Sequence, residues 1–395
     1  MTDTMTQQTS TSDILGTYKR APMRFVRGAG VELFDEDGKA YLDFSSGIAV
    51  NALGYGDAGI REVMEGVIES GLIHVSNLYK TEAGERLAHF LVENTFASSV
   101  FFCNSGAEAN EGAFKFARRW GRATGSDAKT GIVALRGGFH GRLFASLAAT
   151  DRPSYRAPFR PLAGGISICE RDPVELDAAL DGESVAAVIV EPVQGEGGVR
   201  VVEPDLLRHI RSITEERGIA LIFDEIQCGL GRLGTFMAYE RTGVVPDMVT
   251  LAKPLGGGLP MGAVLVTEEI AWTIKPGDHG TTFGGGPMVA AVADHVVRRL
   301  ADPALLANVR QNGEWFGEQI SAIARRSEKV RAIRGMGYMW GVDVVEPASA
   351  VVERGWAEGL LIITAGDHTL RILPPLTASR ADLERGLSLL NKLIT

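Results

Sequence analysis

Cysteine is scarce in this sequence, with only Cys103, Cys169 and Cys228 among 395 residues. Three is an odd number and no C-x-x-C pair occurs, so we expect neither a disulfide framework nor a metal site. Positive charge is also in deficit, because 40 Lys and Arg face 49 Asp and Glu and give a net charge of −9. Nucleic acid and anionic membranes need concentrated positive charge, so neither is expected as the main partner. The reduced cysteines favour a cytoplasmic protein.

Long hydrophobic runs are absent as well. No segment approaches the roughly 20 apolar residues that span a bilayer. The Thr- and Ser-rich start predicts a disordered tail over residues 1–14, without a secretory signal. Hydrophobic residues make up 45% and charged residues 23%, as is typical of a globular protein, and the length predicts a large domain with a smaller one.

Short apolar runs alternate with longer amphipathic stretches from about Glu62 onward. Near-continuous apolar strands between helices are typical of a largely parallel sheet covered on both faces, which predicts an α/β fold. Ligands of such sheets bind at the carboxyl ends of the strands. The predicted strands are Val100–Cys103, Ile132–Leu135, Gly165–Cys169, Val185–Val190, Ala220–Phe223 and Met248–Leu251.

The two ends of the chain have different patterns. The turn Phe34–Gly38 predicts a hairpin between two alternating runs. A long amphipathic stretch, Gly286–Arg326, predicts one interdomain helix, which leads into strand-like segments of an α+β domain at Val330–Val345 and Thr369–Leu373. The predicted units are an N-terminal segment joining the small domain (15–60), a large domain (61–310) and a C-terminal small domain (311–395).

Polar residues end two of the predicted strands. Asp224 and Gln227 follow the run Ala220–Phe223, where a buried polar group needs a specific partner. Lys253 follows Met248–Leu251 and is itself followed by three glycines, which let a ligand approach the backbone. A desolvated lysine has the lowered pKa that imine formation requires. A lysine beside glycines is more often a surface residue, so a catalytic role for Lys253 is inferred only from its occurrence together with Asp224 and Gln227.

Together these residues fit pyridoxal 5′-phosphate. A carboxylate at Asp224 would keep the pyridine nitrogen protonated, and Lys253 would hold the aldehyde carbon as a Schiff base. The cofactor's phosphate also needs a site. Ser105, Gly106 and Ala107 supply a helix N-terminus with free N–H groups, although Ser105 could equally be only an N-cap.

Gly137–Arg142 follows another predicted strand. Phe139 there is placed to stack on the pyridine ring, and Arg142 to bind a substrate carboxylate with two hydrogen bonds. The alternatives are a core phenylalanine and a solvent-exposed arginine. His140 could be a structural histidine, and we assign it no proton transfer.

Six motifs resemble those of the class III (ornithine-type) aminotransferases, and the resemblance covers the chain from about Tyr18 to the end. Several long motifs in the same order make chance agreement unlikely. The motifs are Asn104-Ser-Gly-Ala-Glu-Ala-Asn110, Phe139-His-Gly-Arg142, Glu191-Pro-Val-Gln-Gly-Glu-Gly-Gly198, Phe223-Asp-Glu-Ile-Gln227, Lys253 with its glycines, and Gly280-Thr-Thr-Phe-Gly-Gly285.

The resemblance implies a fold, an assembly and further site residues. The fold would be fold type I of the pyridoxal-phosphate-dependent transferases, with a seven-stranded sheet in the large domain. The protein would be a homodimer with shared active sites, in which Thr282 of one subunit reaches the phosphate bound by the other. Arg142 would bind a substrate carboxylate, and Glu196 would pair with Arg371 to open or close that arginine to 2-oxoglutarate.

Within that family the chain is most similar to the acetylornithine aminotransferases. The similarity implies transfer of the terminal amine of N-acetylornithine to 2-oxoglutarate, giving N-acetylglutamate semialdehyde and glutamate in arginine biosynthesis. Tyr55 and Gly286 depart from the pattern, which commonly has histidine and asparagine there. Succinyldiaminopimelate, ornithine, 4-aminobutyrate or a carrier-bound lysine precursor remain open as donors. The segments that carry this similarity are Gly47–Leu53, His74–Tyr79 and Leu370–Leu376.

A different class of enzyme is suggested by Gly229-Leu-Gly-Arg-Leu-Gly234. It matches the G-x-G-x-x-G fingerprint of NAD-dependent dehydrogenases. Five residues, Asp224 to Cys228, separate the strand from the first glycine, and no helix start follows, so the context argues against it. A non-enzymatic module that keeps the fold is disfavoured because Asp224, Gln227 and Lys253 are all present.

Overall fold

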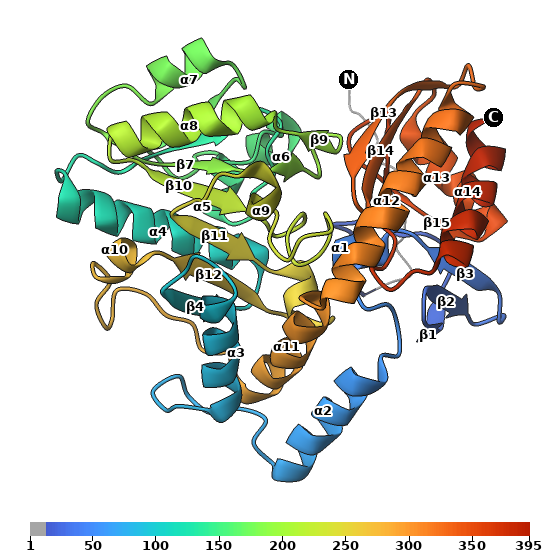
Figure 1. Cartoon of the computed structure of the whole chain (residues 1–395), viewed down its shortest axis with the longest axis horizontal. Coiled ribbons are helices and arrows are strands. Elements are labelled where there is room, and N and C mark those ends of the chain that lie inside the picture. The colour runs from blue at the N-terminus through green and yellow to red at the C-terminus, as the bar shows by residue number, and fades with distance from the viewer. Residues whose placement is uncertain (1–12) are drawn as a thin grey trace, which may run out of the picture.

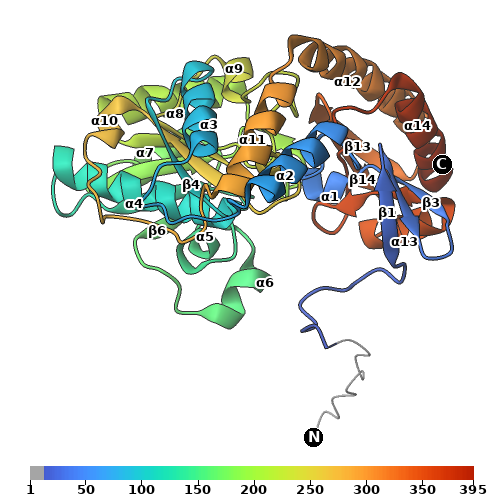
Figure 2. The same cartoon turned by 90° about the horizontal axis from the view of Figure 1, so that it is seen from below.

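The computed structural model describes residues 13–395 (Figures 1 and 2). The predicted tail over residues 1–14 lies outside this range except for its last two residues. Within the described range, no helix combines the length and the hydrophobicity needed to cross a membrane.

A seven-stranded sheet forms the centre of the large domain, with strand order β4-β12-β11-β10-β7-β5-β6. All neighbours from β11 to β6 are parallel, and β12 is antiparallel to both β11 and β4. The predicted α/β fold with a mostly parallel sheet is therefore confirmed. The strands are β4 (Ser99–Cys103), β5 (Gly131–Leu135), β6 (Ile166–Cys169), β7 (Val185–Val190), β10 (Ala220–Asp224), β11 (Met248–Leu251) and β12 (Gly262–Val266).

Apolar side chains on both faces of this sheet are buried because helices cover each face. Figure 2 shows α4 and α5 on one side of the sheet and α3 and α8 on the other. Along β7, Val188 and Val190 belong to one apolar cluster, whereas Ala187 and Ile189 belong to the other. The main helices of this domain are α2 (Ala58–Ser70), α3 (Glu82–Glu93), α4 (Gly106–Thr124), α7 (Pro173–Ala179), α8 (Pro204–Glu216) and α11 (Pro287–Leu300), with short helices α5 (Phe144–Ala148), α6 (Pro153–Arg156), α9 (Tyr239–Thr242) and α10 (Glu268–Ala271).

The smaller α+β domain contains a four-stranded sheet of order β13-β14-β17-β16. A second sheet, β1-β2-β3-β15, joins the N-terminal segment to it, because β3 pairs in parallel with β15. Its β2–β3 hairpin confirms the turn predicted at Phe34–Gly38. The strands are β1 (Phe25–Ala29), β2 (Glu32–Asp35), β3 (Ala40–Asp43), β13 (Val330–Met336), β14 (Met339–Val344), β15 (Leu360–Leu361), β16 (Ile363–Thr364) and β17 (Thr369–Ile372), and the helices are α12 (Pro303–Ala324), α13 (Ala348–Glu358) and α14 (Arg380–Ile394).

The prediction of one interdomain helix over Gly286–Arg326 is wrong. Two helices, α11 and α12, share this stretch and are separated at Asp302. The Asp302 carboxylate accepts hydrogen bonds from Ala304 N at 2.7 Å and Leu305 N at 3.4 Å, and Pro303 occupies the first turn. An N-cap followed by proline starts a new helix, so the amphipathic pattern continues while the helix axis does not.

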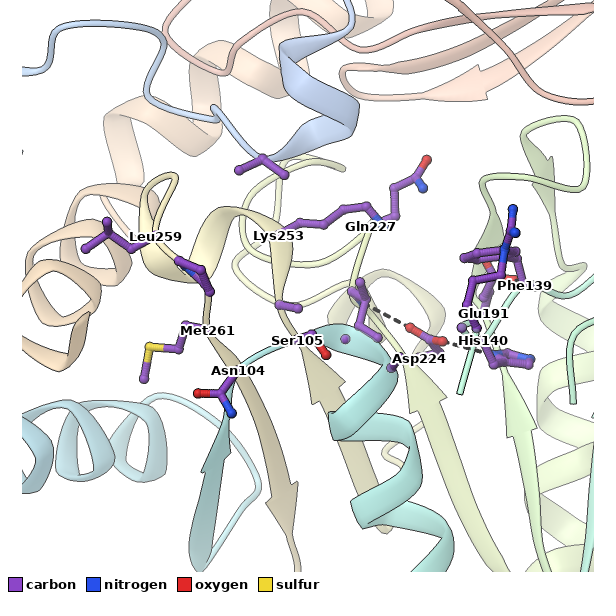
Figure 3. A pocket seen from close by; sticks show the side chains of 18 of the residues that line it. Asn104, Ser105, Phe139, His140, Glu191, Asp224, Gln227, Lys253, Leu259 and Met261 are labelled. Atoms are coloured by element: carbon purple, nitrogen blue, oxygen red, sulfur yellow. Dashed lines mark hydrogen bonds and ion pairs between the residues drawn. The ribbon is translucent and has the colours of Figure 1, made fainter. Parts of the chain in front are cut away.

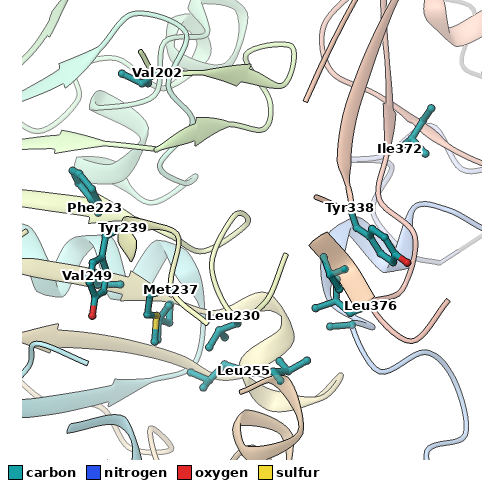
Figure 4. Packing of buried hydrophobic residues seen from close by; sticks show 14 of the residues in the cluster. Val202, Phe223, Leu230, Met237, Tyr239, Val249, Leu255, Tyr338, Ile372 and Leu376 are labelled. Carbon is teal, nitrogen blue, oxygen red and sulfur yellow. The ribbon is translucent and has the colours of Figure 1, made fainter. Parts of the chain in front are cut away.

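One apolar cluster continues from the large domain into the small one. Phe223 and Val249 on the large sheet belong to it, as do Tyr338 and Leu376 across the domain boundary (Figure 4). Leu255, which follows β11, is fully buried in the same cluster. The two domains therefore share a core next to the loops that follow the strands of the large sheet.

Candidate active site

A cavity of about 420 Å³ opens where loops follow the carboxyl ends of β4, β5, β7, β10 and β11 (Figure 3). This is the edge at which parallel sheets bind ligands. Three residues predicted for the site are not in its lining: Glu196, Thr282 and Arg371. The others all line it, namely Ser105, Gly106, Ala107, Phe139, Arg142, Asp224, Gln227 and Lys253.

Lys253 lies in the turn after β11, at the first position of the short 3₁₀ helix Lys253–Gly256. Its φ of 39° is in the left-handed region, which is costly for a residue with a β-carbon and is found mainly where function requires it. Burial lowers the pKa of the Lys253 amine, although Asp224 acts in the opposite direction. A larger fraction of the amine is therefore free at neutral pH than in an ordinary lysine.

Asp224 is the last residue of β10, and its side chain is almost wholly buried. Its Oδ2 accepts hydrogen bonds from Asn110 Nδ2 and from His140 Nδ1, both at 2.8 Å. Its Oδ1 accepts from the backbone N–H of Ile226 at 3.2 Å. These donors fix the orientation of the carboxylate, which lines the cavity and keeps further acceptor capacity on Oδ1.

His140 and Asn110 are site residues that the sequence did not reveal. His140 is 2% exposed and its ring contacts Asp224 rather than the cavity centre, which fits a structural histidine (Figure 3). Burial alone would lower the pKa of His140, but the hydrogen bond and charge of Asp224, together with Glu191, raise it. Asn110 also donates to the His140 carbonyl at 2.7 Å and accepts from Thr250 Oγ1 at 2.8 Å, so the network holds α4, β10 and β11 together.

Glu191, a third residue without a predicted role, follows β7 and lines the cavity. Burial raises the pKa of its carboxyl to about 7, while the charge of His140 opposes the rise. Its Oε1 accepts from the backbone of Phe139 at 2.8 Å and its Oε2 from the backbone of Gly195 at 3.1 Å. Glu191 therefore fixes the loop that carries Phe139 and the loop that carries Glu196.

Ser105 caps α4, because its hydroxyl accepts a hydrogen bond from Glu108 N at 3.2 Å. Ser105 is therefore an N-cap, and because its hydroxyl accepts this bond it still has a proton to donate. The N–H groups of Gly106 and Ala107 begin the helix and have no acceptor within it. A Cβ at Gly106 would lie 2.8 Å from the Ile226 side chain, so a larger residue there would have to displace Ile226 in the loop after β10.

Phe139 and Arg142 both follow β5 and line the cavity. The Arg142 guanidinium lies 3.6 Å from the centre of the Tyr155 ring and 5.8 Å from that of Phe139. Such cation–π contacts restrict a long side chain that is otherwise exposed. Arg142 is held in place and still accessible to a ligand.

Glu196 and Arg371 form an ion pair of 2.6 Å beside the cavity, between a large-domain loop and β17 of the small domain. Arg371 is 2% exposed and also donates from Nη1 to Gln227 Oε1 at 3.0 Å. Gln227 lines the cavity, so it connects the ion pair to the cavity wall. Removing one member of a buried pair commonly costs about 3–5 kcal/mol, so Arg371 needs a counter-charge whenever Glu196 moves away.

Thr282 is exposed and does not line the cavity of its own chain, although Asn104 Nδ2, at the cavity wall, donates to Thr281 Oγ1 at 3.4 Å. Its neighbour Thr281 accepts a hydrogen bond at its carbonyl from Asn77 Nδ2 at 2.8 Å, and the rings of His74 and Phe283 lie 5.3 Å apart. Within a single chain, Thr282 is therefore not part of the cavity wall.

The segment Gly229–Gly234 is no dinucleotide site. β10 ends at Asp224, and only turns precede the four-residue helix α9, so the strand–turn–helix that binds a pyrophosphate is absent here. Arg232 is instead 2% exposed and donates from Nη1 to the carbonyls of Tyr338 at 3.1 Å and Pro374 at 2.5 Å. Burial lowers the pKa of Arg232 to about 9. Through these Arg232 hydrogen bonds, the segment connects the large domain to the small one.

Comparison with known proteins agrees with this geometry. The family description "Aminotransferase class-III" matches residues 16–394. The chain belongs to the class III aminotransferase family. The aminotransferase is 44% identical to the mitochondrial acetylornithine aminotransferase of Alnus glutinosa, over 95% of this chain and 84% of that protein. It is 38% identical to the acetylornithine aminotransferase of Clostridium acetobutylicum, over 98% of this chain and 100% of the relative.

Solved structures show the same fold. The ornithine aminotransferase of Toxoplasma gondii ME49 superimposes with a TM-score of 0.92 at 27% identity, covering 96% of this aminotransferase and 92% of that chain. The N-acetylornithine aminotransferase of Stenotrophomonas maltophilia K279a gives a TM-score of 0.83 at 34% identity, covering 95% and 96%. The fold is therefore fold type I of the pyridoxal-phosphate-dependent transferases, as the sequence predicted. Across residues 13–395, no group of three or more His, Cys, Asp or Glu side chains is arranged to hold a metal ion.

Proposed function

We propose that this aminotransferase transfers the terminal amine of N-acetylornithine to 2-oxoglutarate, a step of arginine biosynthesis, using pyridoxal 5′-phosphate. Membership in class III supports the reaction type and the cofactor. The names of the relatives at 38–44% identity support the donor. The observation that carries the proposal is the convergence of Lys253 and Asp224 on one cavity, from two neighbouring strands of the sheet.

The residues around the cavity fit this cofactor. Asp224 offers a buried carboxylate to a protonated ring nitrogen, and Lys253 offers an amine of lowered pKa to an aldehyde. Phe139 would stack on the ring. The start of α4, with Ser105, Gly106 and Ala107, offers N–H groups and a hydroxyl to a phosphate. Gln227 faces the cavity, but its Oε1 already accepts from Arg371.

Each residue then has a separate task. Bound pyridoxal phosphate supplies an electron sink that stabilises negative charge on the substrate carbon. Lys253 would accept the proton from that carbon and hold it for transfer, for which its lowered pKa suits it. Asp224, oriented by His140 and Asn110, would stabilise a positive charge on the ring nitrogen.

The two substrates make different demands on the carboxylate-binding residues. N-acetylornithine brings one carboxylate, whereas 2-oxoglutarate brings two. We propose that Arg142 binds the distal carboxylate of both. Arg371 would pair with Glu196 while the donor is bound, as in the present structure, and would bind the α-carboxylate of 2-oxoglutarate once Glu196 turns away.

A panel of amines with 2-oxoglutarate, ranked by kcat/KM, tests the donor. N-acetylornithine is expected to rank first, ahead of N-succinyl-diaminopimelate, ornithine and 4-aminobutyrate. Pockets that differ by a small hydrophobic group discriminate by about 1–3 kcal/mol, or about 10- to 200-fold, so the ranking should be clear. Ornithine is the main competitor because its aminotransferases are among the similar structures. A higher kcat/KM for ornithine would replace the proposed donor and leave the reaction type intact.

We also propose a homodimer in which Thr282 completes the phosphate site of the partner subunit. The region around Thr282 supports this, because it exposes a group of large apolar side chains, which often mark an interface. They are Leu72, Ile73, Leu78, Tyr79 and Phe283, of which Leu78 is 88% exposed. The proposed cytoplasmic location is supported by three buried free cysteines.

Dilution tests the shared site. Activity and cofactor retention are expected to fall together as the dimer dissociates, and Thr282→Ala should weaken cofactor retention in an intact dimer. Sedimentation and cofactor absorbance, measured on the same diluted samples, follow the two quantities. A monomer that retains cofactor and full activity would contradict the proposal.

A further inference from the structure

The loop that carries Glu196 lies on one face of the small-domain sheet. Arg334 on β13, Gly341 on β14 and Arg371 on β17 form one row across three neighbouring strands. Directly paired residues of antiparallel strands point to the same face, so both arginine side chains flank the central glycine. A Cβ at Gly341 would lie 2.9 Å from the Val199 side chain and 3.2 Å from Gly198 O. The glycine therefore lets the loop rest on the sheet between the two arginines.

The two arginines hold opposite sides of this loop. Arg371 pairs with the Glu196 carboxylate at 2.6 Å, as described above. Arg334 donates from Nε to the backbone carbonyl of Gly198 at 2.5 Å. Arg371 thus contacts the Glu196 side chain, which must move in the switch, and Arg334 contacts the loop backbone that supports this side chain.

Arg334 is itself fixed by Asp343 and Thr369, a directly paired couple in the next row on the same face of the sheet. Its Nη1 and Nη2 donate to the two oxygens of Asp343 at 2.7 and 2.8 Å, in the forked geometry that suits guanidinium and carboxylate. Thr369 Oγ1 donates to Asp343 Oδ1 at 2.5 Å and accepts from Arg334 Nη2 at 3.3 Å. Thr369 lies two residues before Arg371 on β17. The same strand therefore carries Arg371 and one of the two residues that hold Arg334.

The backbone of the loop is held at its other end too. Glu191 Oε2 accepts from Gly195 N at 3.1 Å, and Arg152 donates to the Glu196 carbonyl. Val199, fully buried, has a φ of 53°, a left-handed conformation that a β-branched residue adopts only where its surroundings impose it. Contacts at residues 195, 196 and 198 leave the Glu196 side chain as the part free to move.

We propose that Arg334, held by Asp343 and Thr369, is a positioning residue for the substrate switch. It fixes the loop backbone on the sheet face that bears Arg371, so that Glu196 changes partners by rotating its side chain while the backbone stays in place. The inference rests on the proposed switch between Glu196 and Arg371. Loss of the Gly198 contact weakens the Glu196–Arg371 pair and thereby acts on the donor half-reaction, in which that pair is needed.

Single-turnover rates of the two half-reactions, measured on the holoenzyme, test the proposal. Glu196→Gln is expected to slow the half-reaction with N-acetylornithine and to leave that with 2-oxoglutarate intact or faster. Arg334→Gln should shift the ratio of the two rates in the same direction by about 10-fold, the effect of losing a hydrogen bond that involves a charged group. Thr369→Val removes one hydroxyl and should give a smaller shift of the same sign. Arg331→Gln, an exposed arginine of the same strand, is the control and should leave the ratio unchanged.

The double variant Arg334→Gln with Glu196→Gln gives the decisive comparison. If Arg334 acts through Glu196, the second substitution adds nothing further to the ratio. A residue that only supports the fold would lower both rates together, with a lower melting temperature and an unchanged ratio, and that result in both Arg334→Gln and Thr369→Val would overturn the proposal. A shift in Glu196→Gln without one in Arg334→Gln also rejects Arg334 but retains the switch. An unchanged ratio in Glu196→Gln rejects the switch and the positioning role with it.

Discussion

Lys253→Ala is expected to lower turnover by more than about 10³-fold, because it removes both the covalent attachment and the proton carrier. The visible absorbance of the attached cofactor should disappear, while the phosphate site at the start of α4 can still retain it non-covalently. Alanine keeps the β-carbon, so the left-handed backbone at this position is equally strained in the variant. Any change in stability then reports on loss of the buried side chain, both its amine and its aliphatic part, and not on backbone strain.

Three measurements check this expectation: the absorbance spectrum, the cofactor content after gel filtration, and turnover. Lys329→Ala serves as the control because Lys329 is exposed and far along the chain in the small domain. Retention of the attached-cofactor spectrum in Lys253→Ala would move the attachment to another amine and reject the assignment.

Asp224→Asn is the second substitution with a large expected effect, a fall in kcat of about 10²–10³-fold. The amide cannot balance a positive charge on the ring nitrogen, so charge developing in the transition state is less well stabilised. The amide also meets a donor at either oxygen position, since His140 and Asn110 donate to Oδ2 and the backbone N–H of Ile226 donates to Oδ1. Cofactor retention should fall less than kcat, because the phosphate contacts are unchanged.

A neighbouring carboxyl offers a matched control. Glu225 is as buried as Asp224, but its oxygens accept from the backbone of Ala238 and Tyr239, at 2.5 and 2.8 Å, and it does not line the cavity. Burial raises the pKa of Glu225 to about 8. The Glu225→Gln variant is expected to be less stable than the unsubstituted enzyme. Its folded fraction should keep kcat within a few-fold of that enzyme. Steady-state kinetics corrected for folded enzyme measures both variants, and similar kcat values for the two would remove Asp224 from its role.

Much of the fold could be predicted because an apolar run that ends in a polar residue marks both a buried strand and the residue at its carboxyl end. Parallel strands bring their carboxyl ends to one edge, so placing Asp224 and Lys253 after neighbouring runs was enough to predict that they meet. The seventh strand, β12, has the same kind of apolar run, Gly262–Val266, but its antiparallel insertion between β4 and β11 has no local signal. The break at Asp302-Pro303 had a local signal that the longer amphipathic pattern obscured.

The site was less predictable where a role depends on a distant partner. His140 and Asp224 are 84 residues apart, and Arg334 and Gly198 are 136 apart. From the sequence alone, His140 after a strand and Arg334 within one look like ordinary structural or surface residues. Their partners are known only from the folded chain. The Glu196–Arg371 contact came from the resemblance to a family, since nothing within either segment indicates the other. The chemical roles of all these residues stay predictions until the variants are measured.

The apolar cluster that runs through both domains limits how substrates can be accommodated. Large rigid-body closure of the small domain would have to pull Tyr338 and Leu376 out of contact with the rest of the core and expose them to water. Burying such side chains is worth about 1.5–3 kcal/mol each, so this motion is costly. Substrates of different length must then be accommodated by rotation of single side chains around the cavity, while the two domains stay in place. Specificity could therefore evolve by few substitutions, without redesign of a hinge.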